Sequence, residues 1–216
     1  MAADDHPIFS LIYRPLADLG ERTGVGEARD EALCQTYGRL LILGLGLGHD
    51  LDHLPSNVSH VIAVEPSASM RRRSQGAVRR STEAGVAVDL IAGHGEDLPL
   101  PNNSVDSALL SLVMCSVTEP EKVLTELVRV LRPGAPVGIL EHVRAPEKTW
   151  TWRLQRSLNR IWPKIAGGCR VDRNTRDSLH RAGFDTSRLR DMRLAKAPVV
   201  APTIVGTVYS PQSPGS

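Results

Sequence analysis

The sequence contains few aromatic residues and few cysteines, and both shortages exclude classes of protein. Aromatic residues make up 4% of the 216 residues, and the three cysteines are Cys34, Cys115 and Cys169. Three cysteines so far apart in the sequence match neither a disulfide framework nor the ligand spacing of a zinc site. We therefore expect neither a disulfide-stabilised scaffold nor a metal centre.

The chain also lacks a long apolar run and a strong net charge. No apolar run reaches the ~18 residues of a membrane span, and no N-terminal stretch resembles a signal peptide. The net charge of +2 is too small to indicate a nucleic-acid partner. The arginine groups at 71–73 and 79–80 are typical of a solvated helix face. We expect a cytoplasmic protein without stable membrane insertion, and the sequence does not specify an oligomeric state.

The length and the 41% hydrophobic content suit one globular domain with a sizeable core. We assign residues 1–210 to this domain and residues 211–216, which are rich in Pro, Ser and Gly, to a flexible tail.

A glycine-rich stretch follows the first strongly apolar run. Residues 40–43 are Leu-Leu-Ile-Leu and lead directly into Gly44-x-Gly46-x-Gly48. A short continuous apolar run is typical of a strand buried on both faces. Alternating glycines after such a strand let the backbone turn tightly and approach a ligand, and the helix behind them offers free N–H groups.

An acidic residue ends the second apolar run, 17 residues after Gly48. This residue is Glu65, which follows Val61-Ile62-Ala63-Val64. An acid about 20 residues beyond a glycine loop, at the tip of the second strand, can accept hydrogen bonds from two ribose hydroxyls. The pair of features indicates a cofactor of the adenosine type.

The glycine spacing distinguishes between cofactors. The nicotinamide fingerprint requires a glycine where this chain has His49, and no tyrosine is followed by lysine four residues later, as a short-chain dehydrogenase requires. Gly-x-Gly-x-Gly instead resembles the pattern of class I methyltransferases that use S-adenosylmethionine (SAM). We therefore favour SAM over a redox cofactor.

Residues 40–143 alternate apolar runs with helical patterns, which predicts a parallel sheet with helices on both faces. We predict strands near 40–45, 60–65, 87–92, 106–113 and 136–142, and helices near 48–55, 67–84, 119–131 and 172–183. Apolar segments near 187–194 and 200–209 are expected to finish the sheet as an antiparallel hairpin. Ligands of such sheets bind at the carboxyl ends of the strands.

Two segments outside this alternation are expected to flank the site. Residues 1–38, which include Phe9 and Tyr13, form either a cover for a sheet edge or a lid over the cofactor. Residues 146–170 contain every tryptophan of the chain, namely Trp150, Trp152 and Trp162. This second segment is either an ordinary amphipathic helix or a cap whose indoles wall an apolar substrate pocket.

Several motifs resemble the type-11 class I SAM-dependent methyltransferases. The glycine loop, Val64-Glu65-Pro66, Gly95-Glu96-Asp97-Leu98-Pro99, Val105-Asp106 and Arg129-Val130-Leu131-Arg132-Pro133-Gly134 carry this resemblance over residues 38–143. It implies an α/β fold of the Rossmann-like class I type, with a seven-stranded, mostly parallel sheet. It also implies a methyltransferase that uses SAM and releases S-adenosylhomocysteine.

A narrower resemblance points to the methyltransferase-like branch that includes alkyl thiol S-methyltransferases. It is carried by Met114-Cys115-Ser116-Val117, Leu140-Glu141-His142-Val143, and Gly168-Cys169 with the residues that follow. It implies methyl transfer to the thiol of a small apolar molecule. The residues that the two resemblances imply for SAM are Gly44, Leu45, Gly46, Gly48, Glu65, Pro66, His94, Gly95, Glu96, Leu112 and Cys115.

Three positions depart from the family pattern. Ile42 replaces an acid before the first glycine, His94 replaces the usual acid before the adenine-contacting backbone, and Ala135 replaces a second glycine after Pro-Gly. The first two departures are expected to weaken cofactor affinity.

His142 is our candidate for the base or orienting group, since it ends the predicted fifth strand and imidazole titrates near neutral pH. The alternative for His142 is a histidine that is merely hydrogen-bonded at a strand end. Glu141 is a weaker catalytic candidate that could point into the helix layer instead, and Cys115 is expected to be a wall residue.

Two other functions stay open: N-, O- or C-methylation of a lipid, quinone or other small metabolite, and a SAM-binding module without catalysis.

Overall fold

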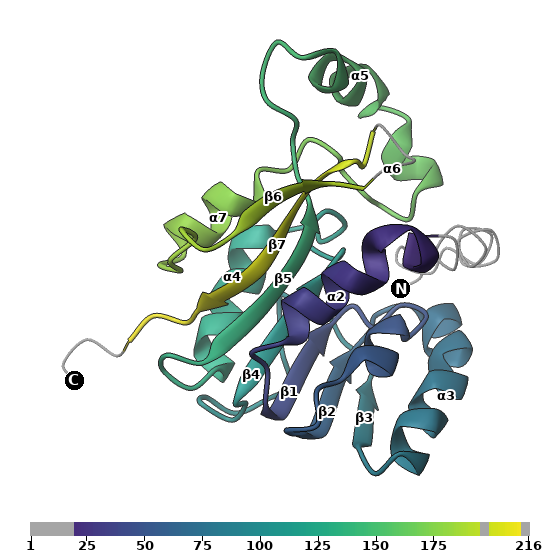
Figure 1. The fold of residues 1–216 in the computed structure, drawn as a ribbon, viewed down its shortest axis with the longest axis vertical. Coiled ribbons are helices and arrows are strands. Elements are labelled where there is room, and N and C mark those ends of the chain that lie inside the picture. The colour runs from purple at the N-terminus through teal and green to yellow at the C-terminus, as the bar shows by residue number, and fades with distance from the viewer. Residues whose placement is uncertain (1–19, 195–198, 213–216) are drawn as a thin grey trace.

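A single seven-stranded sheet forms the centre of the computed structural model, which describes residues 20–194 and 199–212 (Figure 1). The strand order is β3-β2-β1-β4-β5-β7-β6, and only β7 runs antiparallel to its neighbours. The strands are β1 (Gly38–Leu43), β2 (Val58–Val64), β3 (Ala87–Ile91), β4 (Ser107–Ser111), β5 (Pro136–His142), β6 (Arg190–Arg193) and β7 (Pro202–Tyr209). The predicted parallel sheet and its antiparallel C-terminal hairpin are confirmed.

Helices cover both faces of this sheet. The helices are α2 (Gly26–Leu33), α3 (Ala68–Glu83), α4 (Pro120–Val130), α5 (Trp150–Leu158), α6 (Trp162–Ile165) and α7 (Thr175–Arg181). A π-helical turn (Glu21–Val25) precedes α2, and a 3₁₀ turn (His49–His53) follows β1. Among the described residues, no helix combines the length and apolar character needed to cross a membrane.

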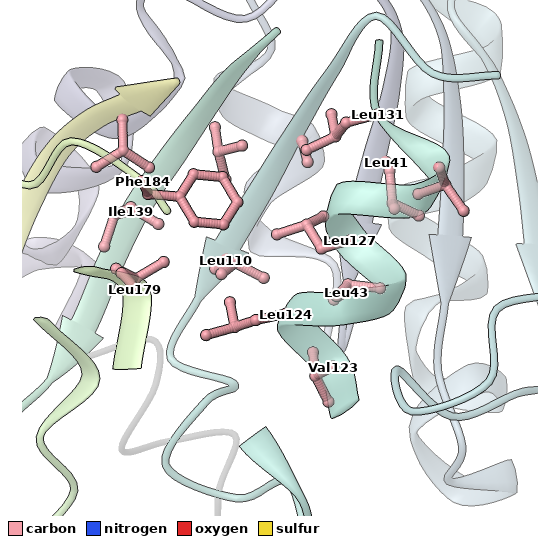
Figure 2. Close-up of a cluster of buried hydrophobic side chains, with 14 of the residues drawn as sticks. Leu41, Leu43, Leu110, Val123, Leu124, Leu127, Leu131, Ile139, Leu179 and Phe184 are labelled. Atoms are coloured by element: carbon pink, nitrogen blue, oxygen red, sulfur yellow. The ribbon is translucent and has the colours of Figure 1, made fainter. Parts of the chain in front are cut away.

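The apolar run of β1 is continuous because both faces of the strand are buried. Leu41 and Leu43 face one core, whereas Leu40 and Ile42 face the other. Figure 2 shows the first core, in which Leu124 and Leu127 of α4 pack against the sheet together with Phe184.

The opposite face receives α2, which lies across the middle of the sheet (Figure 1). Its residues Ala28, Ala32 and Leu33 are buried against the strands. Gly138 of β5 makes this close packing possible, because a Cβ there would collide with the carbonyl oxygen of Ala32. The N-terminal helix of the described region is thus part of the second core.

Two strands end earlier than the sequence predicts, and one helix is shorter. β1 ends at Leu43 because Gly44 adopts a φ of 69°, and β4 ends at Ser111 because Leu112 adopts a φ of 55°. The helix expected near 48–55 is only the 3₁₀ turn, since Gly48 is left-handed and Leu54 is already extended. Each early end turns the chain at the carboxyl edge of the sheet.

Candidate functional site

The carboxyl ends of the parallel strands bring the predicted site segments to one edge of the sheet. The glycine loop follows β1, Glu65 follows β2, and the 112–116 loop follows β4. Residues 141–142 are the last two residues of β5. This convergence follows from the parallel pairing of β2 with β1, β1 with β4, and β4 with β5.

The three loop glycines are required for different reasons. All have positive φ, with values of 69°, 56° and 85° for Gly44, Gly46 and Gly48. A Cβ on Gly44 would lie 2.6 Å from Val113 Cγ2, and one on Gly48 would lie 2.8 Å from Ala77 Cβ. A Cβ on Gly46 would meet nothing closer than a loop carbonyl at 3.9 Å. Gly46 therefore faces open space and leaves room for a ligand against the backbone.

Glu65 is fixed beside this open space. Its Oε2 accepts a hydrogen bond from the Gly46 N–H at 2.8 Å, and its Oε1 accepts one from the Ser67 N–H at 2.9 Å. The residue is 5% exposed. Burial raises the pKa of the Glu65 carboxyl, and the two N–H donors only partly offset this rise. The neighbouring Pro66 is exposed, and its carbonyl accepts a hydrogen bond from Arg71.

A buried ion network, which sequence analysis missed, ties α2 to the glycine loop. The Arg29 guanidinium pairs with Asp50, donates to Ser111 Oγ at 2.6 Å, and pairs with Glu21 at 2.9 Å. Burial opposes ionisation of Glu21, but hydrogen bonds from His49 and Arg29 outweigh it and lower the Glu21 pKa to about 2. No local sequence pattern predicts this network, because Arg29 and Asp50 are 21 residues apart in the sequence.

The 94–97 loop is anchored mainly by Glu96. The Glu96 Oε1 accepts hydrogen bonds from the N–H groups of Thr118 and Glu119, at 3.0 and 3.2 Å, just before α4 begins. A Cβ on Gly95 would lie 3.3 Å from Val123, so the loop packs closely on α4. His94 is exposed. The Glu96 carboxylate therefore shapes the loop.

Glu141 is completely buried at the end of β5 and points toward the loop after β4. Its Oε1 accepts hydrogen bonds from Val113 N–H and Met114 N–H at 2.9 and 2.8 Å. Its Oε2 is buried without a hydrogen-bond partner, and burial raises the pKa of this carboxyl well above its ordinary value. Glu141 therefore anchors the backbone of Val113 and Met114 beside the site and does not point into the helix layer.

His142 is a neutral imidazole. Burial lowers its pKa to about 4, although a hydrogen bond to the Val200 backbone favours the protonated form. The Nδ1 atom is buried and has no hydrogen-bond partner. In the neutral tautomer that carries its proton on Nε2, Nδ1 keeps a free lone pair that can accept a proton or a hydrogen bond.

The predicted wall residues Leu112 and Cys115 lie against different cores, since Leu112 packs on the second core and Cys115 belongs to a small third one. Leu112 is partly buried, and Cys115 is buried in a cluster with Cys169, Val171 and Val199. Cys115 and Cys169 are far apart in the sequence, but the fold brings them into one cluster. Both are free thiols.

The three tryptophans occupy three different environments. Trp150 is 61% exposed, whereas Trp162 packs against the cluster of Cys115 and Cys169. Trp152 stacks on Arg156 and lines an open cavity of about 480 Å³. The three indoles thus differ in exposure and in neighbours, and Phe9 and Tyr13 lie outside the described residues.

Comparison with known proteins adds a family and a fold. The family described as "Methyltransferase domain" matches residues 41–139. Among solved structures, geranyl diphosphate methyltransferase in complex with SAM superposes with a TM-score of 0.67 at 12% identity, covering 88% of this chain and 86% of that one. The [4+2]-cyclase SpnF gives 0.66 at 18% identity, covering 88% and 80%. At these identities the structural likeness shows the fold alone.

The curated relatives are methyltransferases with different acceptors. Human thiol S-methyltransferase TMT1A is 29% identical over 71% of this chain and 63% of its own length. Rat thiol S-methyltransferase TMT1B is 31% identical over 69% and 61%. Demethylmenaquinone methyltransferase of Clavibacter sepedonicus is 34% identical over 50% and 42%. This chain spans about three fifths of the length of the two thiol S-methyltransferases.

Proposed function

We propose that this chain, in which residues 41–139 form a methyltransferase domain, catalyses SAM-dependent methylation of the thiol of a small apolar molecule. The observation that carries the proposal is the junction of Gly46, which faces open space, with the buried Glu65 carboxylate. SAM is the cofactor that the family match and the structural neighbours imply.

The residues present fit SAM. The open space at Gly46 accommodates a ligand against the backbone, and the acid at the end of β2 suits a pair of ribose hydroxyls. We assign the methionine part to Gly44, Leu45, Gly46 and Gly48, and the ribose to Glu65 with Pro66. We assign the adenine to His94, Gly95 and Glu96, and the methyl-donor side to Leu112 and Cys115.

When bound, SAM supplies a methyl group activated by a positively charged sulfur. The protein then has to exclude water and align the acceptor, and alignment alone can contribute roughly 7–11 kcal/mol. The buried walls near Glu141 and Cys115 provide a dry lining. His142 Nδ1 is the atom that we propose to accept the hydrogen bond or proton of the acceptor.

The weakness of this base supports a thiol acceptor. An imidazole with a pKa of about 4 holds a proton poorly. A thiol with a pKa of about 8.5 ionises with little help, whereas an alcohol requires a much stronger base. Similarity to the thiol S-methyltransferases supports the same acceptor.

The test is S-adenosylhomocysteine release with matched alkyl and aryl thiols, alcohols, phenols and amines. We expect turnover on the thiols alone, and a fall of about 10-fold in kcat/KM for His142→Ala, which corresponds to the loss of one hydrogen bond. Cys34→Ala, which removes an exposed thiol, is the control and should retain full activity. Turnover on amines or phenols instead would keep the domain assignment and overturn the thiol acceptor.

A second candidate function is methylation of a lipid or quinone at an anionic membrane surface. A basic surface on α5 and the turn after it favours this function: Arg153, Arg156 and Arg160 line the 480 Å³ cavity with Trp152. Trp150, which begins α5, and Ile161, which lies just before α6, are 61% and 60% exposed. Exposed indole and aliphatic groups among arginines are typical of a helix that lies on a membrane surface. One relative, the demethylmenaquinone methyltransferase, is named for a quinone substrate.

Vesicle flotation separates the two candidates. A lipid-surface enzyme should float with anionic vesicles but not with neutral ones, and Trp150→Ala with Arg153→Gln should abolish flotation. Exchanging the paired surface arginine Arg80 for Gln should leave flotation unchanged. Absence of flotation with either vesicle would remove this second candidate.

A further inference from the structure

Cys115 and Cys169 form a buried dithiol where two segments of the chain meet. Cys115 lies in the loop after β4, and Cys169 follows α6. The Arg170 N–H donates to the Cys115 carbonyl at 2.8 Å, which joins the two backbones directly. The two thiols share one hydrophobic cluster, in which Cys115 Sγ also lies 3.6 Å from the Leu112 carbonyl oxygen and 3.5 Å from Ser116 Oγ.

The surroundings of the pair contain unsatisfied polar groups. The Trp162 indole N–H is buried without a hydrogen-bond partner, and Trp162 packs against the cluster that contains both cysteines. The Glu141 Oε2 is also buried without one, and the Oε1 of the same carboxyl accepts the N–H of Met114, the residue before Cys115, at 2.8 Å. These groups make the pocket around the thiols polar on one side, which is unusual for cysteines that serve only as apolar filling.

The two thiols differ in acidity and access. The interaction with Cys115 lowers the pKa of the Cys169 thiol, whereas the same interaction and burial raise the pKa of the Cys115 thiol. Cys169 is 8% exposed and Cys115 is 2% exposed, so a small reagent reaches Cys169 first. An acidic, more accessible thiol beside a protonated one is the arrangement of reactive dithiols.

We propose that Cys115 and Cys169 are an oxidative modification site at which hydrogen peroxide closes an intramolecular disulfide. The Cys169 thiol gives up its proton, and its sulfur attacks one oxygen of hydrogen peroxide. The O–O bond breaks, and the departing hydroxide takes that proton and leaves as water, which gives a sulfenic acid. The Cys115 sulfur then attacks the Cys169 sulfur, an S–S bond forms, and the S–O bond breaks. The departing hydroxide takes the Cys115 proton as a second water. Two thiols are oxidised and one peroxide is reduced, with no further reagent.

The disulfide would link the segment that follows α6 covalently to the loop after β4. Gly167 and Gly168, directly before Cys169, both have positive φ, at 58° and 86°, so the segment reaches the loop through a tight turn. If the proposed function holds, this loop borders the methyl-donor side of the site. Oxidation should then change activity as well as stability.

The test uses the full chain with Cys34→Ser, since exposed Cys34 would otherwise form disulfides between molecules. After hydrogen peroxide treatment, unfolding and maleimide blocking, we expect loss of two hydrogens and one linked peptide pair containing Cys115 and Cys169. Dithiothreitol should reverse both changes. Melting temperature should rise by about 5–10 °C, since the bridge closes a long loop. Persistence of two free thiols at peroxide levels that oxidise Cys34 in the wild-type chain would overturn the proposal.

Single variants test the assigned order of attack. With Cys115→Ser, Cys169 should accumulate sulfenic and then sulfinic acid, because no second thiol resolves it. With Cys169→Ser, Cys115 should stay unmodified at the same peroxide concentration. Equal oxidation of both variants, or the reverse order, would contradict the assignment. Mass mapping needs no substrate, so failure here is distinguishable from failure of the proposed methyltransferase activity.

Discussion

The Glu65 carboxylate accepts the Gly46 N–H at 2.8 Å, and this bond joins the end of β2 to the glycine loop after β1. The second carboxylate oxygen accepts the Ser67 N–H at 2.9 Å, just before α3. Glu65 is thus held in one orientation before any ligand arrives. Such preorganisation is what a ribose-binding acid requires, and it makes the residue the most informative one to change.

Glu65→Gln should weaken SAM binding while the fold persists. The amide places an NH₂ group against one of the two backbone N–H donors, and the charge-assisted bonds to the ribose are lost. We expect a loss of about 1.5–3 kcal/mol, roughly 10- to 100-fold in Kd by titration calorimetry. Glu83→Gln, on the exposed end of α3, is the matched control and should leave Kd unchanged. An unaltered Kd for Glu65→Gln would remove Glu65 from the site.

Alanine at Gly46 and at Gly48 should have different effects. Both positions have positive φ, which costs an L-residue about 1 kcal/mol. Gly48→Ala also drives its Cβ to 2.8 Å from Ala77, so unfolding in urea should show an additional loss of about 1–3 kcal/mol. Gly46→Ala should instead affect SAM affinity more than stability. Equal losses of stability for the two variants would contradict the open space assigned to Gly46.

Removing Arg29 should strongly destabilise the fold, because Asp50 would be left buried without its partner. Such changes cost about 3–5 kcal/mol. Arg29→Met should therefore lower the free energy of unfolding by that amount, and adding Asp50→Leu should restore a large part of it. A double variant no more stable than Arg29→Met alone would show that the ion pair does not act as a unit.

His142 should make stability depend on pH between 6.5 and 4. The unfolded chain takes up a proton near pH 6.5, whereas the folded chain does so only near pH 4. The unfolded state binds more protons in this window, so stability falls as pH decreases through it. Urea unfolding should show that the wild type loses about 1–3 kcal/mol more than His142→Gln between these limits. Parallel pH profiles for the two proteins would show that His142 is not buried as a neutral ring.

Glu141 should tolerate an amide but not an apolar replacement. In Glu141→Gln, the side-chain oxygen keeps the Val113 and Met114 N–H bonds, and the ionisable group is gone. Its melting temperature should equal or exceed that of the wild type. Glu141→Leu leaves two buried donors unsatisfied, each costing about 1–3 kcal/mol. A melting temperature for Glu141→Leu equal to that of Glu141→Gln would refute the anchoring role.

The sheet could be predicted from the sequence because its central strands are buried on both faces. Leu40 to Leu43 form an unbroken apolar run for that reason, and the left-handed glycines mark where the run ends. The position of Glu65 beside Gly46 follows from parallel pairing of two adjacent strands. Fold and site location thus depend on local patterns that the sequence displays.

The chemistry at the edge of the sheet depends on contacts between distant segments, which no local pattern reveals. Arg29 meets Asp50 only after α2 has packed across the sheet, and Cys115 meets Cys169 only after α6 has turned back. The low pKa of His142 likewise results from its burial in the folded chain. The sequence identifies His142 as a candidate base or orienting group, but it does not reveal that the pKa of this imidazole is low.

The most direct measurement of the central claim is transfer of a labelled methyl group from SAM to a small alkyl thiol by the purified full chain. We predict a methyl thioether that carries the label, formed in equal amounts with S-adenosylhomocysteine, and roughly 5- to 50-fold less of this product with Glu65→Gln at a SAM concentration near the wild-type Kd. Saturable SAM binding without any labelled thioether would contradict the account and identify the chain as a SAM-binding module or as an enzyme with another acceptor.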